Sequence, residues 1–399
     1  MEMLDLLKCQ EEELAKYCFE NITKSSNNPS VDRKSHTLIM QALFGLKEIT
    51  EITLDTPLKI LWKITGRCNA NCKHCWAKLG FDHSHEALMK LADEICDNNV
   101  LMVSISGGEP FLREDIFDIL EKLKSNNILI DIMTNGSLID EKVVCRLKNI
   151  LNIDTDVVQI SLDGPNSEIH DSQRNTKIFE KAVNAIQLLK QHNIKVRNVF
   201  TATPINQHYI FETYKLANSL GVDTFAPAPV FPLRRGKKFE NKLDDMVYIR
   251  QVAACKQIED KMKTKLRIQV GQKYQYLINK YYDKLNTDIF DSRESRIVCL
   301  NETNAFMQID SEGDALPGPE WEKEAAAGNV YEEGLMNVWK KGNKWKEFRK
   351  NRDLTKCFCN ECKIFNICRG GHAKYAYDAY GTINMPDATC IIAKENDDL

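Results

Sequence analysis

The sequence predicts an α/β fold in which helices cross over a parallel sheet. From residue 57 onward, short apolar runs alternate with longer amphipathic runs, and this alternation is typical of strands joined by helices. The chain has 399 residues and a hydrophobic content of 43%, which is enough for a large core and more than one domain. Strand–helix units repeated in this way form either an open, doubly wound sheet or a partial barrel.

The expected strands are rich in β-branched and apolar residues and lie at residues 59–65, 101–106, 128–134, 157–162, 195–202 and 222–228. The expected helices between them carry apolar residues at helical spacing and include residues 114–125, 141–150, 179–192 and 209–220. In parallel barrels the reactive loops follow the carboxyl ends of the strands. The residues directly after each strand are therefore the first candidates for a site.

The composition divides the chain into four expected parts. Residues 1–56 are polar and helical and are expected to cap the fold, with partner binding as the alternative. Residues 57–235 form the core, and residues 236–298 form a helical bridge with helices expected at 244–263 and 274–282. From residue 299 to residue 399 cysteine, glycine and proline return, and a helical run is expected at 335–349.

Charge and hydropathy exclude two classes of partner. The net charge is −3 and the 28% charged residues are mixed in sign, so the chain has neither a nucleic-acid footprint nor a polybasic patch. No apolar run approaches the length of a membrane span, and the acidic N-terminus is unlike a signal peptide. We expect a soluble, cytoplasmic protein that binds neither nucleic acid nor a membrane.

The cysteines are clustered rather than spread along the chain. There are 14 of them, and disulfides would be unusual in the reducing cytosol. Cys68, Cys72 and Cys75 follow the first expected strand at the spacing C-x3-C-x2-C, which is short enough for the three thiolates to bind one metal centre. A four-iron cluster held by three thiolates keeps one iron open for chemistry. The alternative at this stage is zinc.

Polar and glycine-rich stretches end the next three strands. Gly107-Gly108-Glu109-Pro110 ends the second, and glycine lets the backbone approach a ligand closely. The alternative is an ordinary turn with a helix that starts near the proline. Thr134 and Asn135 end the third strand, Ser161 ends the fourth, and Arg174 follows as a residue suited to a carboxylate.

Together these motifs resemble the signature of the radical S-adenosylmethionine (SAM) superfamily. The resemblance implies a partial (β/α)6 TIM-like barrel in which Cys68, Cys72 and Cys75 hold a four-iron cluster (4Fe–4S) that binds SAM. It implies reductive cleavage of SAM to a 5′-deoxyadenosyl radical, which abstracts a hydrogen from a substrate. The implied SAM-binding residues are His74, Gly107, Gly108, Glu109, Pro110, Thr134, Asn135, Ser161 and Arg174.

The C-terminal cysteines resemble the SPASM extension of peptide- and protein-modifying members. The matching positions are expected to ligate one auxiliary 4Fe–4S cluster, with a zinc knuckle as the alternative, and they are Cys359, Cys362, Cys368 and Cys390. The other auxiliary site of the family departs from its pattern. Cys299 and Gly313 match it, but Gly318 and His372 stand where cysteines are expected. We therefore expect that auxiliary cluster to be absent, with Cys357 as a spare thiol and His372 as a possible replacement ligand.

The resemblance implies a radical SAM enzyme of the oxidoreductase type that acts as a maturase of a ribosomally made peptide. An external one-electron donor resembling flavodoxin or ferredoxin would be its partner. Glu320 is a candidate acid/base group, and its alternative role is that of an exposed carboxylate. Two other functions stay open: a radical SAM oxidoreductase acting on a carbohydrate or tetrapyrrole, and a non-catalytic iron–sulfur or zinc protein that binds a partner.

Overall fold

The computed structural model describes residues 55–240, 242–262, 266–269, 278, 305–342, 345–350, 352–362, 365–368, 370–390 and 392. Three expectations lie outside these residues: nearly all of the N-terminal helical segment, the helix at 274–282 apart from residue 278, and the placement of Cys299.

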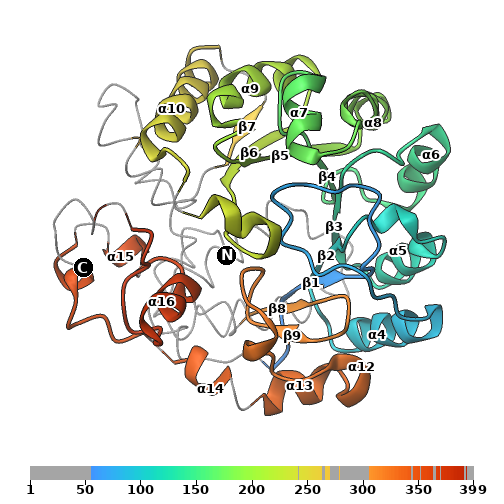
Figure 1. Cartoon of the computed structure of the whole chain (residues 1–399). Coiled ribbons are helices and arrows are strands. Elements are labelled where there is room, and N and C mark those ends of the chain that lie inside the picture. The colour runs from blue at the N-terminus through green and yellow to red at the C-terminus, as the bar shows by residue number, and fades with distance from the viewer. Residues whose placement is uncertain are drawn as a thin grey trace, which may run out of the picture.

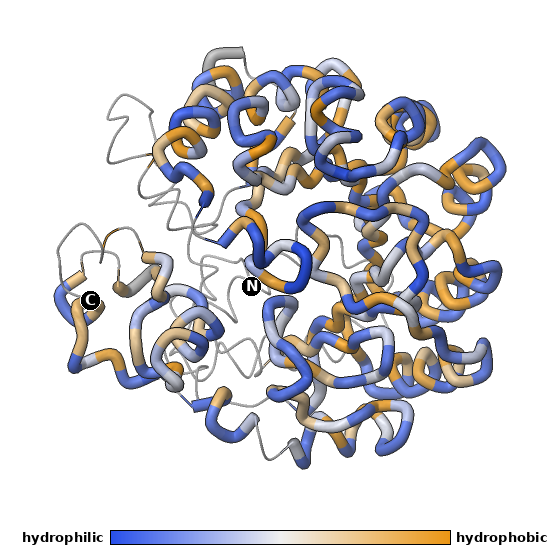
Figure 2. The backbone as a smooth tube through the Cα atoms, in the orientation of Figure 1, coloured by the Kyte–Doolittle hydropathy of each residue, from blue (hydrophilic) through white to orange (hydrophobic). Residues whose placement is uncertain are grey.

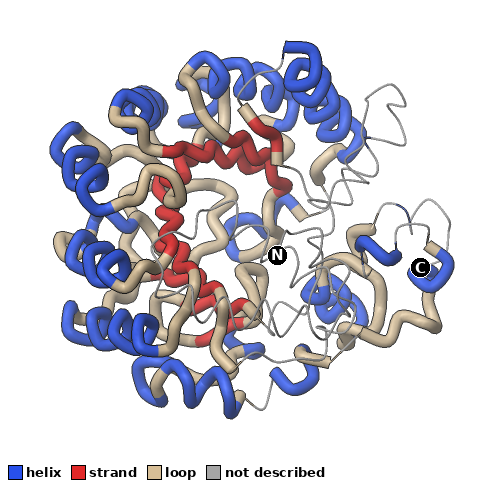
Figure 3. The backbone as a smooth tube through the Cα atoms, turned by 180° about the vertical axis from the view of Figure 1, so that it is seen from behind, coloured by secondary structure: helices blue, strands red, loops and turns tan. Residues whose placement is uncertain are grey.

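The expected strands form one curved, parallel sheet with helices outside it (Figure 3). Each strand pairs with the next one in the chain, so the fold is a partial (β/α)6 TIM-like barrel, as the sequence predicts. Every crossover is a helix, as parallel pairing requires. The strands are β1 (Lys59–Lys63), β2 (Met102–Ser106), β3 (Leu129–Thr134), β4 (Val157–Ser161), β5 (Lys195–Ala202) and β6 (Thr224–Pro229).

Three further strands, which the sequence did not predict, extend the sheet at its two edges. β7 (Arg267–Ile268) pairs with β6, while β8 (Phe306–Ile309) pairs in parallel with β1, and β9 (Ala315–Leu316) pairs antiparallel with β8. Among the described residues the strand order is β7-β6-β5-β4-β3-β2-β1-β8-β9. The segment after residue 304 thus adds directly to the edge of the sheet that carries the cysteine loop.

Amphipathic helices cover the outer face of the sheet (Figure 1). In α5, Ile116, Ile119, Leu120 and Leu123 are buried at helical spacing. Hydrophilic and hydrophobic residues alternate along these helices (Figure 2). The helices are α4 (His85–Asp97), α5 (Ile116–Ser125), α6 (Glu141–Ile150), α7 (Ser167–Arg174), α8 (Phe179–Gln191), α9 (Ile210–Ser219) and α10 (Asp245–Met262).

The C-terminal region is built of short helices. The continuous helix expected at 335–349 is wrong, because α13 ends before Gly342 and α14 begins at Trp345. Glu94 of α4 accepts a hydrogen bond from the first main-chain N–H of α13, at 2.6 Å, and thereby caps it. The helices are α12 (Val330–Glu333), α13 (Leu335–Lys341), α14 (Trp345–Phe348), α15 (Phe365–Cys368) and α16 (Ala373–Tyr380).

Strand β1 separates two environments. Ile60, Trp62 and Ile64 face the helices and belong to the main apolar core, and the Trp62 indole donates to the hydroxyl of Tyr331 on α12, at 3.1 Å. Residues of a strand alternate between faces, so Lys63 points to the concave inner side of the sheet. No described helix combines the length and apolar character needed to cross a membrane.

Truncating the core behind β2 should destabilise the protein. Ile105 is fully buried, so Ile105→Ala should lower the free energy of unfolding by about 2–5 kcal/mol, because it leaves a cavity. Chemical denaturation followed by circular dichroism measures this change. Leu79→Ala, at a side chain that is 41% exposed, is the matched control and should change stability by less than about 0.5 kcal/mol. Equal losses of stability in the two variants would contradict the burial of Ile105.

Candidate functional site

The first three cysteines lie together in the loop after β1. Cys72 is buried, Cys68 and Cys75 are partly buried, and the three pack with Ala70 and Ile178. Burial raises the pKa of the Cys68 thiol to about 11 and also raises that of Cys72. Desolvated thiols of this kind become thiolates when a metal cation offsets their charge. The donor set therefore fits a metal cluster held by three thiolates.

The glycine-rich stretch after β2 is held against this loop by backbone hydrogen bonds. The Gly108 N–H donates to the Thr65 carbonyl, and the Glu109 N–H donates to the Arg67 carbonyl, both at 2.8 Å. A Cβ at position 108 would lie 2.0 Å from the Arg67 carbonyl oxygen, and Gly107 has a φ of +151°. Both positions therefore require glycine, because the loop after β2 approaches the start of the cysteine loop so closely.

Glu109 connects the second strand to the third. Its side chain is fully buried, and its Oε1 accepts from the Thr134 hydroxyl at 2.7 Å while its Oε2 accepts from the Asn135 N–H at 2.8 Å. Oε1 also accepts from the N–H of Phe111, next to Pro110, where a short 3-10 helix begins. Burial raises the pKa of Glu109, and these hydrogen bonds oppose the rise. The structure thus brings Glu109, Thr134 and Asn135 together.

A side-chain ladder then connects the third strand to the cysteine loop. The Asn135 amide donates to Asn69 Oδ1, and the Asn69 amide donates to the Ser137 hydroxyl, each at 2.9 Å. Asn69 lies between the first two cysteines of the motif. The ladder therefore fixes the cysteine loop from the side of β3.

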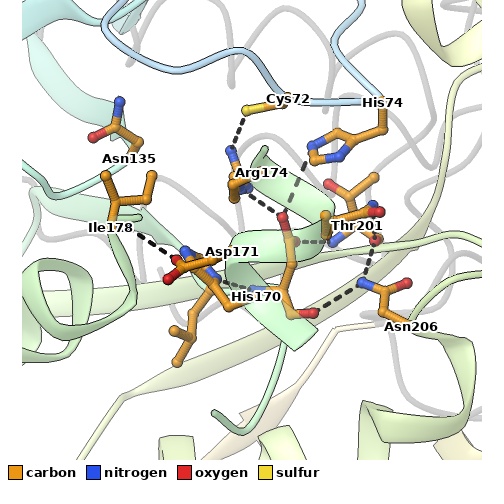
Figure 4. Close-up of polar contacts among 12 residues, drawn as sticks. Cys72, His74, Asn135, His170, Asp171, Arg174, Ile178, Thr201 and Asn206 are labelled. Carbon is orange, nitrogen blue, oxygen red and sulfur yellow. Dashed lines mark hydrogen bonds and ion pairs between the residues drawn. The ribbon is translucent and has the colours of Figure 1, made fainter. Parts of the chain in front are cut away.

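A buried ion pair fixes the opposite side of the loop (Figure 4). Arg174 Nε lies 2.6 Å from Asp163 Oδ2, and the Arg174 Nη1 donates to Cys72 Sγ at 3.6 Å. Burial disfavours a charged Asp163, but Arg174, together with His74, His170 and the Thr201 N–H, outweighs it and holds the pKa of this carboxyl below its usual range. The site therefore presents a guanidinium directly beside one of the three sulfurs.

His74 contacts the same carboxylate. Its Nε2 lies 3.8 Å from Asp163 Oδ2, and the ring is buried rather than in solvent. Burial lowers the pKa of His74 to about 3, so the imidazole is neutral. Its Nδ1 has no hydrogen-bond partner among the described residues. Ser161 ends β4, two residues before Asp163, and is half-buried.

Sequence reasoning assigned no role to Asp163, although it stands at a strand end. Its Oδ1 accepts from the Thr201 N–H at 2.7 Å, and its own N–H donates to His170 Nδ1 at 3.0 Å. Its carbonyl accepts from the Asn206 amide at 2.9 Å. Asp163 thus joins β4 to β5 and to α7. The signal that could have found it is an acidic residue directly after a buried strand.

The other cysteine set lies in the C-terminal region and lines one pocket. The pocket receives Cys359 and Cys362 from around a 3-10 helix, Cys368 from α15, and Cys390 from the last described loop. Burial raises the pKa of Cys359 to about 12 and that of Cys368 to about 11. Four sulfurs on one pocket fit a four-thiolate cluster. Cys357 does not line this pocket, and its thiol donates to the Leu354 carbonyl at 3.2 Å.

Glu320 and His372 meet, which the sequence did not predict. His372 Nδ1 lies 3.5 Å from Glu320 Oε1, and only 3% of the Glu320 residue is exposed. The expected alternative for Glu320, an exposed carboxylate, is therefore wrong, because the surrounding chain encloses it. Gly318 forms the turn before it, where its carbonyl accepts from the Trp321 N–H. Gly313 makes a tight turn at a φ of +94°.

Comparison with known families agrees with this geometry. Residues 62–217 match the family model described as the radical SAM superfamily. Residues 299–363 match the SPASM family, described as an iron–sulfur cluster-binding domain. The first match contains the three-cysteine loop and the ends of β1 to β5, and the second contains Cys359 and Cys362.

Individual relatives cover most of the chain. The mycofactocin maturase MftC of Mycobacterium tuberculosis is 29% identical over 87% of this chain and 86% of its own length. An AdoMet-dependent heme synthase of Methanosarcina barkeri is 24% identical over 84% of this chain and 97% of its own length. The crystal structure of Streptococcus suis SuiB bound to its precursor peptide SuiA matches with a TM-score of 0.70 and 20% identity, over 95% of this chain and 89% of that one.

Gly108→Ala should abolish SAM binding, because a Cβ at position 108 would overlap the Arg67 backbone and displace the cysteine loop. Equilibrium dialysis of SAM against the reconstituted variant measures this loss. Gly221→Ala is the control: its φ is +74° with open space around the Cβ, so it carries backbone strain of about 1 kcal/mol without a clash. Unchanged SAM binding by Gly108→Ala would contradict the proposed packing of the two loops.

Removing the first cysteine set should remove one cluster and spare the other. The reconstituted wild-type protein should hold about eight irons in two clusters. The triple variant Cys68→Ala, Cys72→Ala and Cys75→Ala should hold about four irons and cleave no SAM. Iron analysis and detection of 5′-deoxyadenosine measure the two results. Retained cleavage, or a wild-type iron content near four or twelve, would argue against this assignment.

Proposed function

This chain is a radical SAM enzyme with a SPASM-type iron–sulfur domain, and on that premise we propose that it modifies a ribosomally made peptide. The observation that carries the proposal is the pair of cysteine sites, three sulfurs at the mouth of the barrel and four in the C-terminal pocket. MftC, the relative with 29% identity, is a maturase, and SuiB, which shares the fold, was solved with a precursor peptide.

We propose that Cys68, Cys72 and Cys75 hold the SAM-binding cluster. SAM bound there would supply radical chemistry for removing hydrogen from the substrate, once an external donor provides the electron. The protein's work is to position the reactants and exclude water. Arg174, with its charge beside Cys72, supports a role in binding an anionic group of SAM.

The remaining SAM-binding assignments follow from the same geometry. The neutral ring of His74 offers a flat, buried surface for adenine, and its orphaned Nδ1 is available for a hydrogen bond. Ser161 and the backbone of Gly107 and Gly108 stand at the strand ends that meet at the cysteine loop. Glu109, Thr134 and Asn135 hold those ends in place. Pro110 starts the short helix that turns the chain away.

We propose that the C-terminal cluster transfers electrons. Four thiolates leave no open iron, and such clusters suit electron transfer or structural support. An external flavodoxin- or ferredoxin-like protein would deliver the electron to the SAM site. Cysteines that are to hold two such clusters must stay reduced rather than form disulfides, which supports a location in the reducing cytoplasm.

Glu320 is the proposed acid/base group of the C-terminal region. It is enclosed, and its partner His372 can accept or return a proton at Nδ1, 3.5 Å away. This contact supports a proton-transfer role for the pair. The other auxiliary cluster remains absent in this proposal, because Gly318 and His372 stand where its cysteines are expected.

A second function is favoured by one observation. The Methanosarcina barkeri relative is an AdoMet-dependent heme synthase, and its whole length is nearly covered by this chain. A tetrapyrrole with acidic side chains is therefore the runner-up substrate. It differs from a peptide in its intense visible absorbance, so substrate screening separates the two.

The experiment is anaerobic reconstitution with iron and sulfide, followed by incubation with SAM and dithionite. We expect 5′-deoxyadenosine, detected by liquid chromatography and mass spectrometry, because the three-thiolate site leaves one iron open. Short peptides encoded beside this gene are then added, and a mass change of one of them identifies the substrate. The triple cysteine variant is the control. A preparation with full iron that forms no nucleoside would refute the enzyme assignment.

A further inference from the structure

Lys63 stands out as a buried cation beside the three-cysteine loop. It is the last residue of β1, on the face opposite the helix-packed Trp62, and only 4% of it is exposed. Its Nζ lies 4.0 Å from the centre of the Trp76 ring, and Trp76 follows Cys75 directly. The lysine therefore lies on the concave side of the sheet, next to the proposed reaction site.

Among the described residues, the side chain of Lys63 makes no ion pair and donates no hydrogen bond. The carboxylate that acts on it electrostatically is that of Asp310, which follows β8. Asp310 Oδ1 already accepts from the N–H groups of Glu312 and Asp314, at 2.9 and 3.1 Å. A buried ammonium without a counter-ion costs several kcal/mol. Burial therefore lowers the pKa of Lys63, and a carboxylate bound beside it would favour the ammonium form.

The neighbouring cations have partners of their own. Arg234, after β6, pairs with Glu322 at 3.6 Å, and Lys78 of the cysteine loop pairs with Glu312. Burial, Arg234 and Lys78 lower the pKa of Lys63, against the attraction of Asp310 and Cys75, to about 7. Among these three cations of the described chain, Lys63 alone lacks a paired carboxylate.

Leu61, two residues before Lys63 on β1, is flanked by polar side chains that lack hydrogen-bond partners in the described part of the chain. Leu61 pairs in register with Ser104 of β2 and with Gln308 of β8, and both polar residues are fully buried. The Ser104 hydroxyl and both amide atoms of Gln308 have no hydrogen-bond partner among the described residues. Buried polar groups are normally satisfied, so these atoms also point to a ligand or an ordered water.

We propose that Lys63, with Gln308 and Ser104 beneath it, forms a carboxylate-binding subsite on the inner face of the barrel. The ammonium supplies the charge, and the amide N–H and the hydroxyl supply further donors to the two carboxylate oxygens. The ligand is an acidic side chain or the C-terminal carboxylate of the substrate. The proposed function is needed only to identify the molecule that carries this carboxylate as the substrate. The subsite itself does not depend on that function. A carboxylate bound in this subsite would place a neighbouring carbon atom of the substrate beside the cysteine loop.

Three small probes test the subsite without turnover. N-acetylglutamic acid α-amide carries a side-chain carboxylate, N-acetylglutamine carries a C-terminal one, and N-acetylglutamine amide carries neither. Saturation-transfer NMR measures their binding to the reconstituted, SAM-loaded, full-length protein. We expect one acid to bind roughly tenfold more tightly than the neutral amide, as a hydrogen bond to a charged group predicts. The acid that binds identifies the source of the carboxylate.

Variants of the protein test whether Lys63 causes the preference for the acid over the neutral amide. Lys63→Met should abolish the preference and Lys63→Arg should keep most of it. Lys59→Met, on the same face at the other end of β1, should leave it unchanged. Iron content and the thermal midpoint verify that each variant is folded. Equal binding of the acids and the amide to the wild type, or a preference that survives in Lys63→Met, would overturn the subsite. Failure to form 5′-deoxyadenosine would refute the proposed function and leave this binding result intact.

Discussion

The carboxylate of Glu109 is the contact on which the geometry of the barrel mouth depends. A fully buried carboxylate is unfavourable unless its oxygens are hydrogen-bonded. Glu109 meets this requirement with the hydroxyl of Thr134 and the N–H of Asn135, both at the end of β3. Its own N–H donates to the first turn of the cysteine loop, after β1. The backbone and side chain of this one residue therefore link the ends of three parallel strands, and these contacts hold the loop that carries the three thiols.

A second buried acid, Asp163, performs the corresponding task on the other side of the loop. Glu109 contacts neutral donors, whereas Asp163 faces the guanidinium of Arg174. The difference has a chemical consequence. The pair Asp163–Arg174 keeps a positive charge in contact with Cys72 although the surroundings are apolar. Removing Asp163 would leave that charge uncompensated, so the acid positions the arginine rather than acting on a ligand itself. The two acids together restrain the loop from β3 and from β4.

Sequence reasoning located the strands and both cysteine sets because those signals are local. Apolar runs mark β1 to β6 within a few residues, and thiol spacing marks the sites. It missed β8, since a four-residue strand far along the chain pairs with β1 only through tertiary packing. It also gave Lys63 no role. Whether a lysine in an apolar run reaches solvent or faces an enclosed interior depends on curvature of the sheet, and no local pattern encodes that curvature. The meeting of Glu320 and His372 likewise joins residues 52 positions apart.

The two cysteine sites differ in the surroundings of their sulfurs, and this difference suits them to different roles. The C-terminal pocket sets its four thiols among apolar side chains, including Phe358, Phe365 and Ile392. Four thiolates in such surroundings would leave a bound cluster no open iron, which supports the proposed role in electron transfer or structural support. The first site has one ligand fewer, a guanidinium beside a sulfur and the ammonium of Lys63 behind its loop. Positive charge of this kind attracts anionic groups, which supports the proposal that SAM and the substrate bind at the barrel.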